Sequence, residues 1–181
     1  MEGALRLFFA LPLPPDLGGA LGRWQRAQAG FEGGSRPEGL HLTLAFLGER
    51  TPEGLPALEA AVADVAPRHR AFPLRTAGLG GFPEGGRARV LWLGLAPCPA
   101  LEALAADLRG ALAAAGEGFD AKPFRAHLTL ARFRRPRPVE AFAAPPPAAF
   151  PADRFVLFES RPRGCYTPLR AWHLPGAERR V

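Results

Sequence analysis

The sequence has no asparagine or isoleucine, a single lysine (Lys122) and only two serines, Ser35 and Ser160. With no Gly-x-Ser-x-Gly pattern either, chemistry by a serine nucleophile is not expected. The two cysteines, Cys98 and Cys165, lack the paired spacing of zinc sites and disulfide scaffolds, so a reducing compartment fits best. The scarcity of Cys, Met, Gln and Asn suits a heat-adapted protein, although a GC-rich genome would produce the same bias.

Long hydrophobic runs are also missing. The first apolar run, Leu7–Leu11, ends at Pro12, is too short to span a membrane and has no signal-peptide cleavage pattern. We therefore expect a cytoplasmic protein without membrane contact. With 48% hydrophobic residues, the 181-residue chain can bury the core of one domain. The stretch Gly78–Gly81 lacks the spacing and the Lys-Ser/Thr pair of a phosphate-cradling loop, and no cofactor is indicated.

Acidic residues are outnumbered by basic ones, 17 to 23, and the net charge of +6 favours a polyanionic partner such as nucleic acid. Residues 1–90 hold ten basic and nine acidic residues, whereas residues 91–181 hold thirteen and eight. Four of the C-terminal cations fall within six residues that include no acid: Arg132, Arg134, Arg135 and Arg137. This run is either a solvated surface loop or the mouth of a cleft that binds an RNA backbone.

The most informative feature is an internal repeat. The segment His41-Leu-Thr-Leu-Ala45 recurs letter for letter as His127-Leu-Thr-Leu-Ala131, and the two copies hold two of the four histidines and two of the five threonines. Two copies 86 positions apart indicate a duplicated half-domain and exclude an array of short repeats. The surroundings repeat as well, because an apolar run of strand length opens each half, at 6–11 and at 89–95.

These patterns predict an α+β domain of two pseudo-symmetric lobes, each a mainly antiparallel sheet backed by helices. The lobes are expected near 1–88 and 89–181, with the terminal segments free to exchange between them. Predicted strands are 6–11, 41–47, 72–76, 89–95, 127–133, 154–159 and 169–174. Predicted helices are one capped by Asp16 with Leu17, Leu21 and Trp24 on one face, one from Thr51-Pro52 to Val65, and one with Leu101, Leu104, Leu108 and Leu112 on one face. Residues 134–151 should form a long loop with at most a short helix near 139–143.

The repeated segment can carry chemistry because side chains alternate along a strand. His41 and Thr43 share one face, as do His127 and Thr129, and two-fold symmetry of the lobes would bring both faces into one central cleft. Two opposed imidazoles can act as general acid and general base on either side of a phosphorus atom, while the threonine hydroxyls bind its oxygens. No carboxylate lies in either copy, so a metal is not needed. One copy alone would most often be an ordinary strand with a surface histidine, whereas two identical copies favour a shared catalytic site.

The two His-x-Thr-x segments resemble those of the 2H phosphoesterases, and within them the RNA 2',3'-cyclic phosphodiesterases, also called 2'-5' RNA ligases. The resemblance covers nearly the whole chain. It includes the segments 6–10, 46–48, 80–83, 90–92 and 166–172, and Arg132 after the second copy. Ala126 departs from the pattern, since members often carry proline before the second histidine. This departure affects the entry to the strand and not the reacting groups.

The resemblance implies hydrolysis of a 2',3'-cyclic phosphate end of RNA to a 2'-phosphomonoester, without a metal or ATP. In it, His41 would donate a proton to the departing 3' oxygen and His127 would accept one from water. Thr43, Thr129 and Arg132 would bind the phosphate. The residues alone do not decide which histidine is the acid. Run in reverse, the same site would join such an end to a 5'-hydroxyl in a 2'-5' linkage.

The implied partner is RNA with a 2',3'-cyclic phosphate end, tRNA halves being one example, and a monomer is expected because both lobes supply the site. Arg134 and Arg135 are further candidates for RNA contact. Phe46, Phe82 and Tyr166 could stack on bases, although most phenylalanines of such a domain belong to its core. Two alternatives stay open: a phosphodiesterase of another substrate, such as a small cyclic nucleotide or 2'-5' oligoadenylate, and a non-catalytic module that binds RNA ends.

Overall fold

The computed structural model describes residues 3–31, 34–35 and 39–176. Its α-helices are α1 (Pro15–Ala27), α2 (Leu55–Val62) and α3 (Pro99–Ala114). Its strands are β1 (Leu5–Pro12), β2 (Gly34–Ser35), β3 (His41–Arg50), β4 (Phe72–Phe82), β5 (Arg87–Leu95), β6 (His127–Pro138), β7 (Ala149–Ala152), β8 (Arg154–Ser160) and β9 (Tyr166–His173). None of the helices in this described part is long and apolar enough to cross a membrane.

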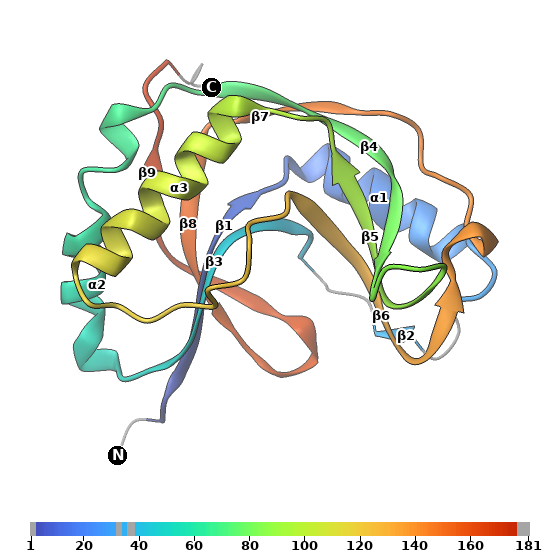
Figure 1. The fold of residues 1–181 in the computed structure, drawn as a ribbon, viewed down its shortest axis with the longest axis horizontal. Coiled ribbons are helices and arrows are strands. Elements are labelled where there is room, and N and C mark those ends of the chain that lie inside the picture. Colours follow the sequence, from blue (N-terminus) through green and yellow to red (C-terminus); the bar gives the residue numbers. More distant parts are fainter. Residues whose placement is uncertain (1–2, 32–33, 36–38, 177–181) are drawn as a thin grey trace.

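All strands belong to one curled antiparallel sheet in the order β7-β4-β5-β6-β3-β1-β8-β9, with β2 paired to β6 (Figure 1). The predicted α+β class is therefore confirmed, in the form of a half-barrel with three helices. The two central strands, β3 and β6, pair only through Leu42 and Leu128, and both of these side chains are fully buried. The sheet thus consists of two halves joined at one residue pair, one formed by β7, β4, β5, β6 and β2 and the other by β3, β1, β8 and β9.

Each half of the sheet contains segments from both halves of the sequence. Strand β4 precedes residue 88 but pairs with β5 and β7, and β8 and β9 follow on from β1 at the other end of the sheet. The helices are exchanged too: α1 packs against β6, where Gln25 donates a hydrogen bond to the carbonyl oxygen of Leu130 at 2.6 Å, and α3 packs against β3. Figure 1 shows α2 and α3 together beside one half of the sheet and α1 beside the other. Both halves of the sheet therefore combine segments from before and after residue 88.

The two motif strands have the same register with their neighbours. Thr43 pairs with Ala10 and Ala45 with Phe9, which leaves Leu44 as an extra residue. On the other side Thr129 pairs with Trp92 and Ala131 with Leu91, which leaves Leu130 as the extra residue. Each motif strand therefore carries a β-bulge one residue after its threonine. Such a bulge reverses the alternation of side chains along the strand that follows it.

The hydrophobic pattern of the longest helix is confirmed. Leu101, Leu104, Leu108 and Leu112 of α3 are all at most 1% exposed and form one face against the sheet. In α1, Leu21 is buried while Asp16 stands inside the first turn. The predicted cap at Asp16 is wrong, because the helix already begins at Pro15 and no side chain caps it. The carboxylate of Asp16 instead lies where the helix dipole favours a negative charge.

Other predicted boundaries differ from the structure. The helix predicted from Thr51 to Val65 is a 3-10 turn at Pro52–Gly54 followed by the shorter α2, and β4 continues to Phe82 instead of ending at Thr76. In the predicted loop 134–151, β6 extends to Pro138 and β7 forms at Ala149–Ala152, on either side of a 3-10 turn at Val139–Ala141. Prolines are tolerated in β7 because it is an edge strand, where an N–H group is not needed on the open side.

We expect the junction of the two halves to be sensitive to truncation. Leu128→Ala removes a fully buried side chain at the only β3–β6 pair and should lower the free energy of unfolding by about 2–5 kcal/mol. Urea denaturation followed by circular dichroism measures this change. Leu169→Ala is the matched control, since Leu169 is 37% exposed, and should change the value by less than about 0.5 kcal/mol. Equal effects of the two substitutions would contradict this account of the junction.

Candidate active site

The two motif histidines are held in the same way. His41 and His127 open β3 and β6, and each ring places Nδ1 against the carbonyl oxygen two residues earlier, that of Gly39 at 2.9 Å and that of Arg125 at 2.7 Å. A carbonyl oxygen only accepts hydrogen bonds, so Nδ1 carries the proton in both rings. In a neutral ring, Nε2 is then left with its lone pair, and in a protonated ring it has a proton to give.

The surroundings disfavour a charge on either ring. Burial lowers the pKa of His41 below its ordinary value, the hydrogen bond to Gly39 opposes this, and the positive charges of His127 and Arg132 lower the pKa further. For His127, burial is again the main cause of a lowered pKa, and the charges of Arg132 and Arg125 add to it. His127 and Arg132 are thus close enough to His41 for their charges to act on its pKa.

Four further predicted residues lie on the face of the sheet that carries the histidines, two before the bulges and two after them. Thr43 and Thr129 are half-buried and lie on the face of the histidines. After the bulges, the buried Ala45 and Ala131 face the core, so the next residues, Phe46 and Arg132, return to the threonine face. The exposed Arg132 thereby lies on the face of the histidines, and its charge lowers the pKa of both rings.

Aromatic rings surround each histidine. The Tyr166 ring meets the His41 ring edge-on at a centroid distance of 4.6 Å, and Phe8 and Phe158 lie 4.7 and 6.3 Å from it. On the other side, Phe82 meets His127 edge-on at 5.3 Å and Trp92 lies 6.2 Å away. Burial raises the pKa of Tyr166, although the charges of Arg132 and Arg6 lower it.

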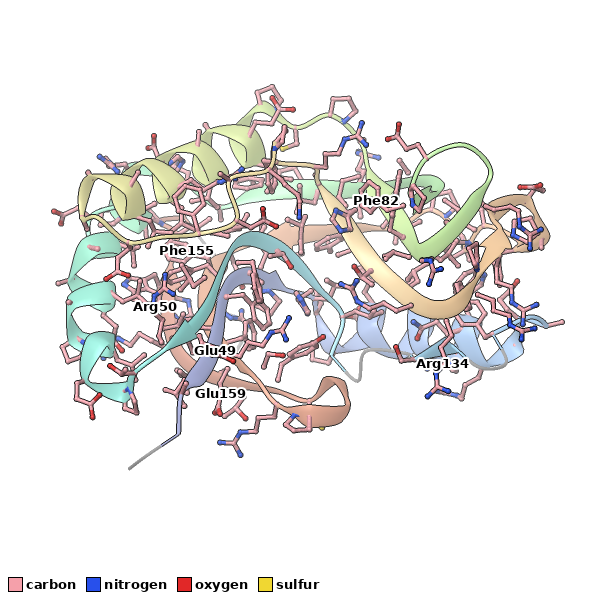
Figure 2. The ribbon with its side chains drawn as sticks, turned by 60° about the horizontal axis from the view of Figure 1, so that its bottom comes forward. Glu49, Arg50, Phe82, Arg134, Phe155 and Glu159 are labelled. Carbon is pink, nitrogen blue, oxygen red and sulfur yellow. The ribbon has the colours of Figure 1, made fainter. Side chains whose placement is uncertain are left out.

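The remaining candidates are not all in this group. Phe46 shares the face of Thr43 but stacks under the guanidinium of Arg6, whose carbon lies 5.0 Å from the ring centroid. Arg134 and Arg135 are exposed further along β6, and Figure 2 shows Arg134 at the outer curve of that strand, well away from Phe82.

Sequence reasoning missed Phe8, Phe158 and Trp92 as wall residues. Phe8 and Trp92 occur in predicted strands and Phe158 occurs in the strand predicted at 154–159, but only the pairing of β1, β5 and β8 shows which way they face. Among the described residues, no three His, Cys, Asp or Glu side chains lie close enough together to hold a metal ion.

The family follows from comparison with known proteins. The sequence profile of the 2'-5' RNA ligase superfamily matches residues 13–163. The chain belongs to this superfamily. It is 38% identical to the RNA 2',3'-cyclic phosphodiesterase of Thermus thermophilus, over 95% of this chain and 91% of that one. It is 36% identical to the Escherichia coli protein of the same name, over 96% and 99%.

Solved structures of the superfamily have the same fold. The crystal structure of Escherichia coli LigT complexed with 3'-AMP superposes with a TM-score of 0.76 at 34% identity, covering 95% of this chain and 99% of that one. The family resemblance read from the repeated motif is thus confirmed. The relatives that match this chain over nearly its full length are RNA 2',3'-cyclic phosphodiesterases.

The geometry predicts how the two imidazoles of this superfamily member titrate. In NMR titrations, both His41 and His127 should have a pKa below the ordinary histidine value of about 6.5, because burial penalises both charged forms. Since the charge of His127 lowers the pKa of His41, His127→Gln should raise the pKa of His41. His173→Gln, at an exposed position of β9, is the control and should leave it unchanged. An unaltered His41 titration in His127→Gln would mean that the rings do not share a site.

Proposed function

We propose that this protein hydrolyses the 2',3'-cyclic phosphate end of RNA to a 2'-phosphomonoester. The observation that carries the proposal is the matched pair of imidazoles, each with Nδ1 bound to a backbone carbonyl and Nε2 left for proton transfer, beside the cation of Arg132. The named activity of relatives from Thermus thermophilus and Escherichia coli supports the same reaction.

The proposed site is a central cleft between two halves related by an approximate two-fold axis at Leu42 and Leu128. The matching registers and bulges of β3 and β6 support this symmetry. It suits displacement in line at phosphorus, in which one oxygen enters on one side as another leaves on the opposite side.

In the proposed reaction, water attacks phosphorus from the side of His127, whose Nε2 takes the proton. The bond between phosphorus and the 3' oxygen breaks as His41 donates its Nε2 proton to that oxygen. Thr43, Thr129 and Arg132 bind the oxygens on which negative charge builds up. The lowered pKa of the buried His41 makes its protonated form a strong acid, and the anionic phosphate favours that form once the substrate is bound.

The same site would join a cyclic phosphate end to a 5'-hydroxyl, giving a 2'-5' linkage, when that hydroxyl attacks phosphorus in place of water. The 5'-hydroxyl then takes the place of water beside His127, and the 3' oxygen again leaves towards His41. The protein acts as a monomer in this proposal, because β3 and β6 of one chain supply both histidines.

The decisive experiment follows the product of a short RNA ending in a 2',3'-cyclic phosphate, incubated with the protein in EDTA. We expect the 2'-phosphomonoester. His41→Ala and His127→Ala should each lower kcat by about 10²–10⁴-fold, the usual contribution of general acid-base catalysis. His173→Ala, at an exposed histidine outside the site, is the control and should be fully active.

Other outcomes would contradict the proposal. A 3'-phosphate product would show that the 2' oxygen, and not the 3' oxygen, leaves phosphorus. Turnover of a small cyclic nucleotide or 2'-5' oligoadenylate but not of RNA would assign another substrate. Binding of the RNA end without turnover would make the protein a recognition module.

We also propose that Arg134 and Arg135 contact the RNA backbone beyond its end, and that Phe46, Phe82 and Tyr166 contact its nucleosides. Changing both arginines to alanine should weaken RNA binding and reduce the slope of log K against log salt concentration by about 1.4, since each neutralised phosphate of a single strand contributes about 0.7. Fluorescence anisotropy at several salt concentrations measures the slope. Arg23→Ala with Arg26→Ala, both exposed on α1, is the matched control. Equal slopes in the two double variants would assign Arg134 and Arg135 to ordinary solvated surface.

A further inference from the structure

A cavity of about 780 Å³ opens beside His127, on the side from which water attacks in the proposed hydrolysis. Its walls come from β4, from β5 and the segment that follows it, from α3, and from the residues that lead into β6. The rings of Phe82, Trp92 and Phe124 line it, together with Arg125. It is therefore continuous with the reacting side of the site and is lined by both aromatic and charged side chains.

The indole of Trp92 shapes this cavity. A Cβ atom at Gly80 would lie 2.1 Å from the Trp92 ring, so only glycine lets the indole rest against β4. The indole Nε1 is buried and has no hydrogen-bond partner in the described part of the chain. The Nε1 of Trp24, which lies outside the cavity, is buried without a partner in the same way, so neither indole N–H group marks a ligand site.

A smaller hollow lies on the other half of the sheet, at Pro12, the residue paired with His41. It measures about 440 Å³ and is lined by Pro12, Phe158 and Arg154 among others. Pro12 is the residue paired with His41, as Gly94 in the larger cavity is paired with His127. Likewise Phe158 pairs with Phe8 of β1 as Phe82 pairs with Val90 of β5.

The two hollows therefore lie at equivalent positions in the two halves of the sheet. Displacement in line at phosphorus also has two sides, one for the entering and one for the leaving oxygen. A site with one hollow per side can hold one nucleoside on each side of the phosphorus.

We infer that the cavity beside His127 binds a second nucleoside, the one that carries the 5'-hydroxyl in the 2'-5' joining reaction. This inference rests on the proposed function, which puts the nucleoside with the cyclic phosphate on the side of His41. In hydrolysis the cavity holds water. The rings of Phe82 and Phe124 offer flat apolar surface on which a base can stack.

The cations of the cavity suit the next phosphate of such a strand. Arg125 is held by an ion pair with Glu84, and its guanidinium also lies 5.9 Å from the centroid of the Phe82 ring. Arg109 is anchored to the carbonyl oxygens of Asp120 and Lys122, at 2.8 and 2.6 Å. Arg109 is thus held at the cavity wall before any ligand binds, whereas Arg125 would exchange its exposed partner Glu84 for a phosphate. Glu102 is a second carboxylate of the cavity wall.

The reverse reaction gives the cleanest probe, because a 2'-5' linked diadenosine monophosphate fills both sides at once. Its free 3'-hydroxyl attacks phosphorus and gives its proton to His41, the bond from phosphorus to the 5' oxygen breaks, and His127 protonates that oxygen. The products are adenosine 2',3'-cyclic phosphate and adenosine. Adenosine is the group that the cavity would hold.

Gly78→Phe tests the inference by filling the cavity. Gly78 lines it, and a Cβ atom there would meet no atom within 4 Å, so the new ring has room to enter. We expect cleavage of the 2'-5' linked dinucleotide to slow by about tenfold or more, because the departing nucleoside loses its binding surface. Hydrolysis of an RNA 2',3'-cyclic phosphate end should change less than about twofold, since its entering group is only water. Ala106→Phe fills the same cavity from α3 and guards against misfolding of the first variant.

Gly18→Phe is the matched control, because Gly18 lies in α1 outside the cavity and a Cβ atom there also meets nothing within 4 Å. It should leave both reactions unchanged. If both cavity-filling variants cleave the dinucleotide at the wild-type rate, or if both slow the two reactions equally, the cavity does not hold the second nucleoside. Wild-type protein that hydrolyses the cyclic end but never cleaves the dinucleotide would also overturn the inference. Wild-type protein that does not hydrolyse the cyclic end would instead refute the proposed function.

Discussion

The pairing of Leu42 with Leu128 is the contact on which the site depends. These two residues are the whole ladder between β3 and β6, and both are fully buried. Because side chains alternate along a strand, burying the two leucines turns their neighbours, His41 and His127 among them, to the opposite face. A shift of either strand by one residue would bury an imidazole and expose a leucine, so the apolar core enforces the register of the polar site.

The second constraint is the bulge that follows each threonine. In a regular strand, Ala45 and Ala131 would share the face of the histidines. The extra residues Leu44 and Leu130 turn these alanines into the core and return Phe46 and Arg132 to the polar face. The guanidinium of Arg132 then lies where it lowers the pKa of both imidazoles. The charge of Arg132 disfavours protonated histidine and also attracts anions. A bound anion would raise both histidine pKa values again and so favour the protonated rings.

The sequence predicted the repeat, both motif strands and the buried face of α3, because each is a local pattern of apolar and polar residues. It did not predict β7, whose four residues include a proline and pair with β4 more than sixty positions earlier. Nor did it predict the roles of Phe8 and Phe158, since the direction of a side chain depends on strand pairing between distant segments. Arg134 and Arg135 follow Arg132 in β6 but lie beyond its regular pairing with β5. Beyond Arg132 the pairing of β6 with β5 is interrupted, with Val90 opposite Arg132 and Ala88 opposite Arg137, and the strand curves away.

A site built from two equal halves needs an asymmetry before it can distinguish the two sides of a phosphorus atom. The asymmetry lies in the walls and not in the histidines. Opposite Thr129 stands Trp92, whereas opposite Thr43 stands Ala10. Trp92 in turn requires its partner on β4 to be a glycine, Gly80. In the other half of the sheet, the equivalent partner of Ala10 on β8 is Val156.

The residues paired with the histidines differ as well, Gly94 with His127 and Pro12 with His41. These replacements accompany hollows of unequal size, about 780 Å³ beside His127 and about 440 Å³ at Pro12, the residue paired with His41. Two chemically identical imidazoles then differ in what can approach them. The substituents that each hollow accepts, and not the intrinsic acidity of either ring, would decide which oxygen enters and which leaves.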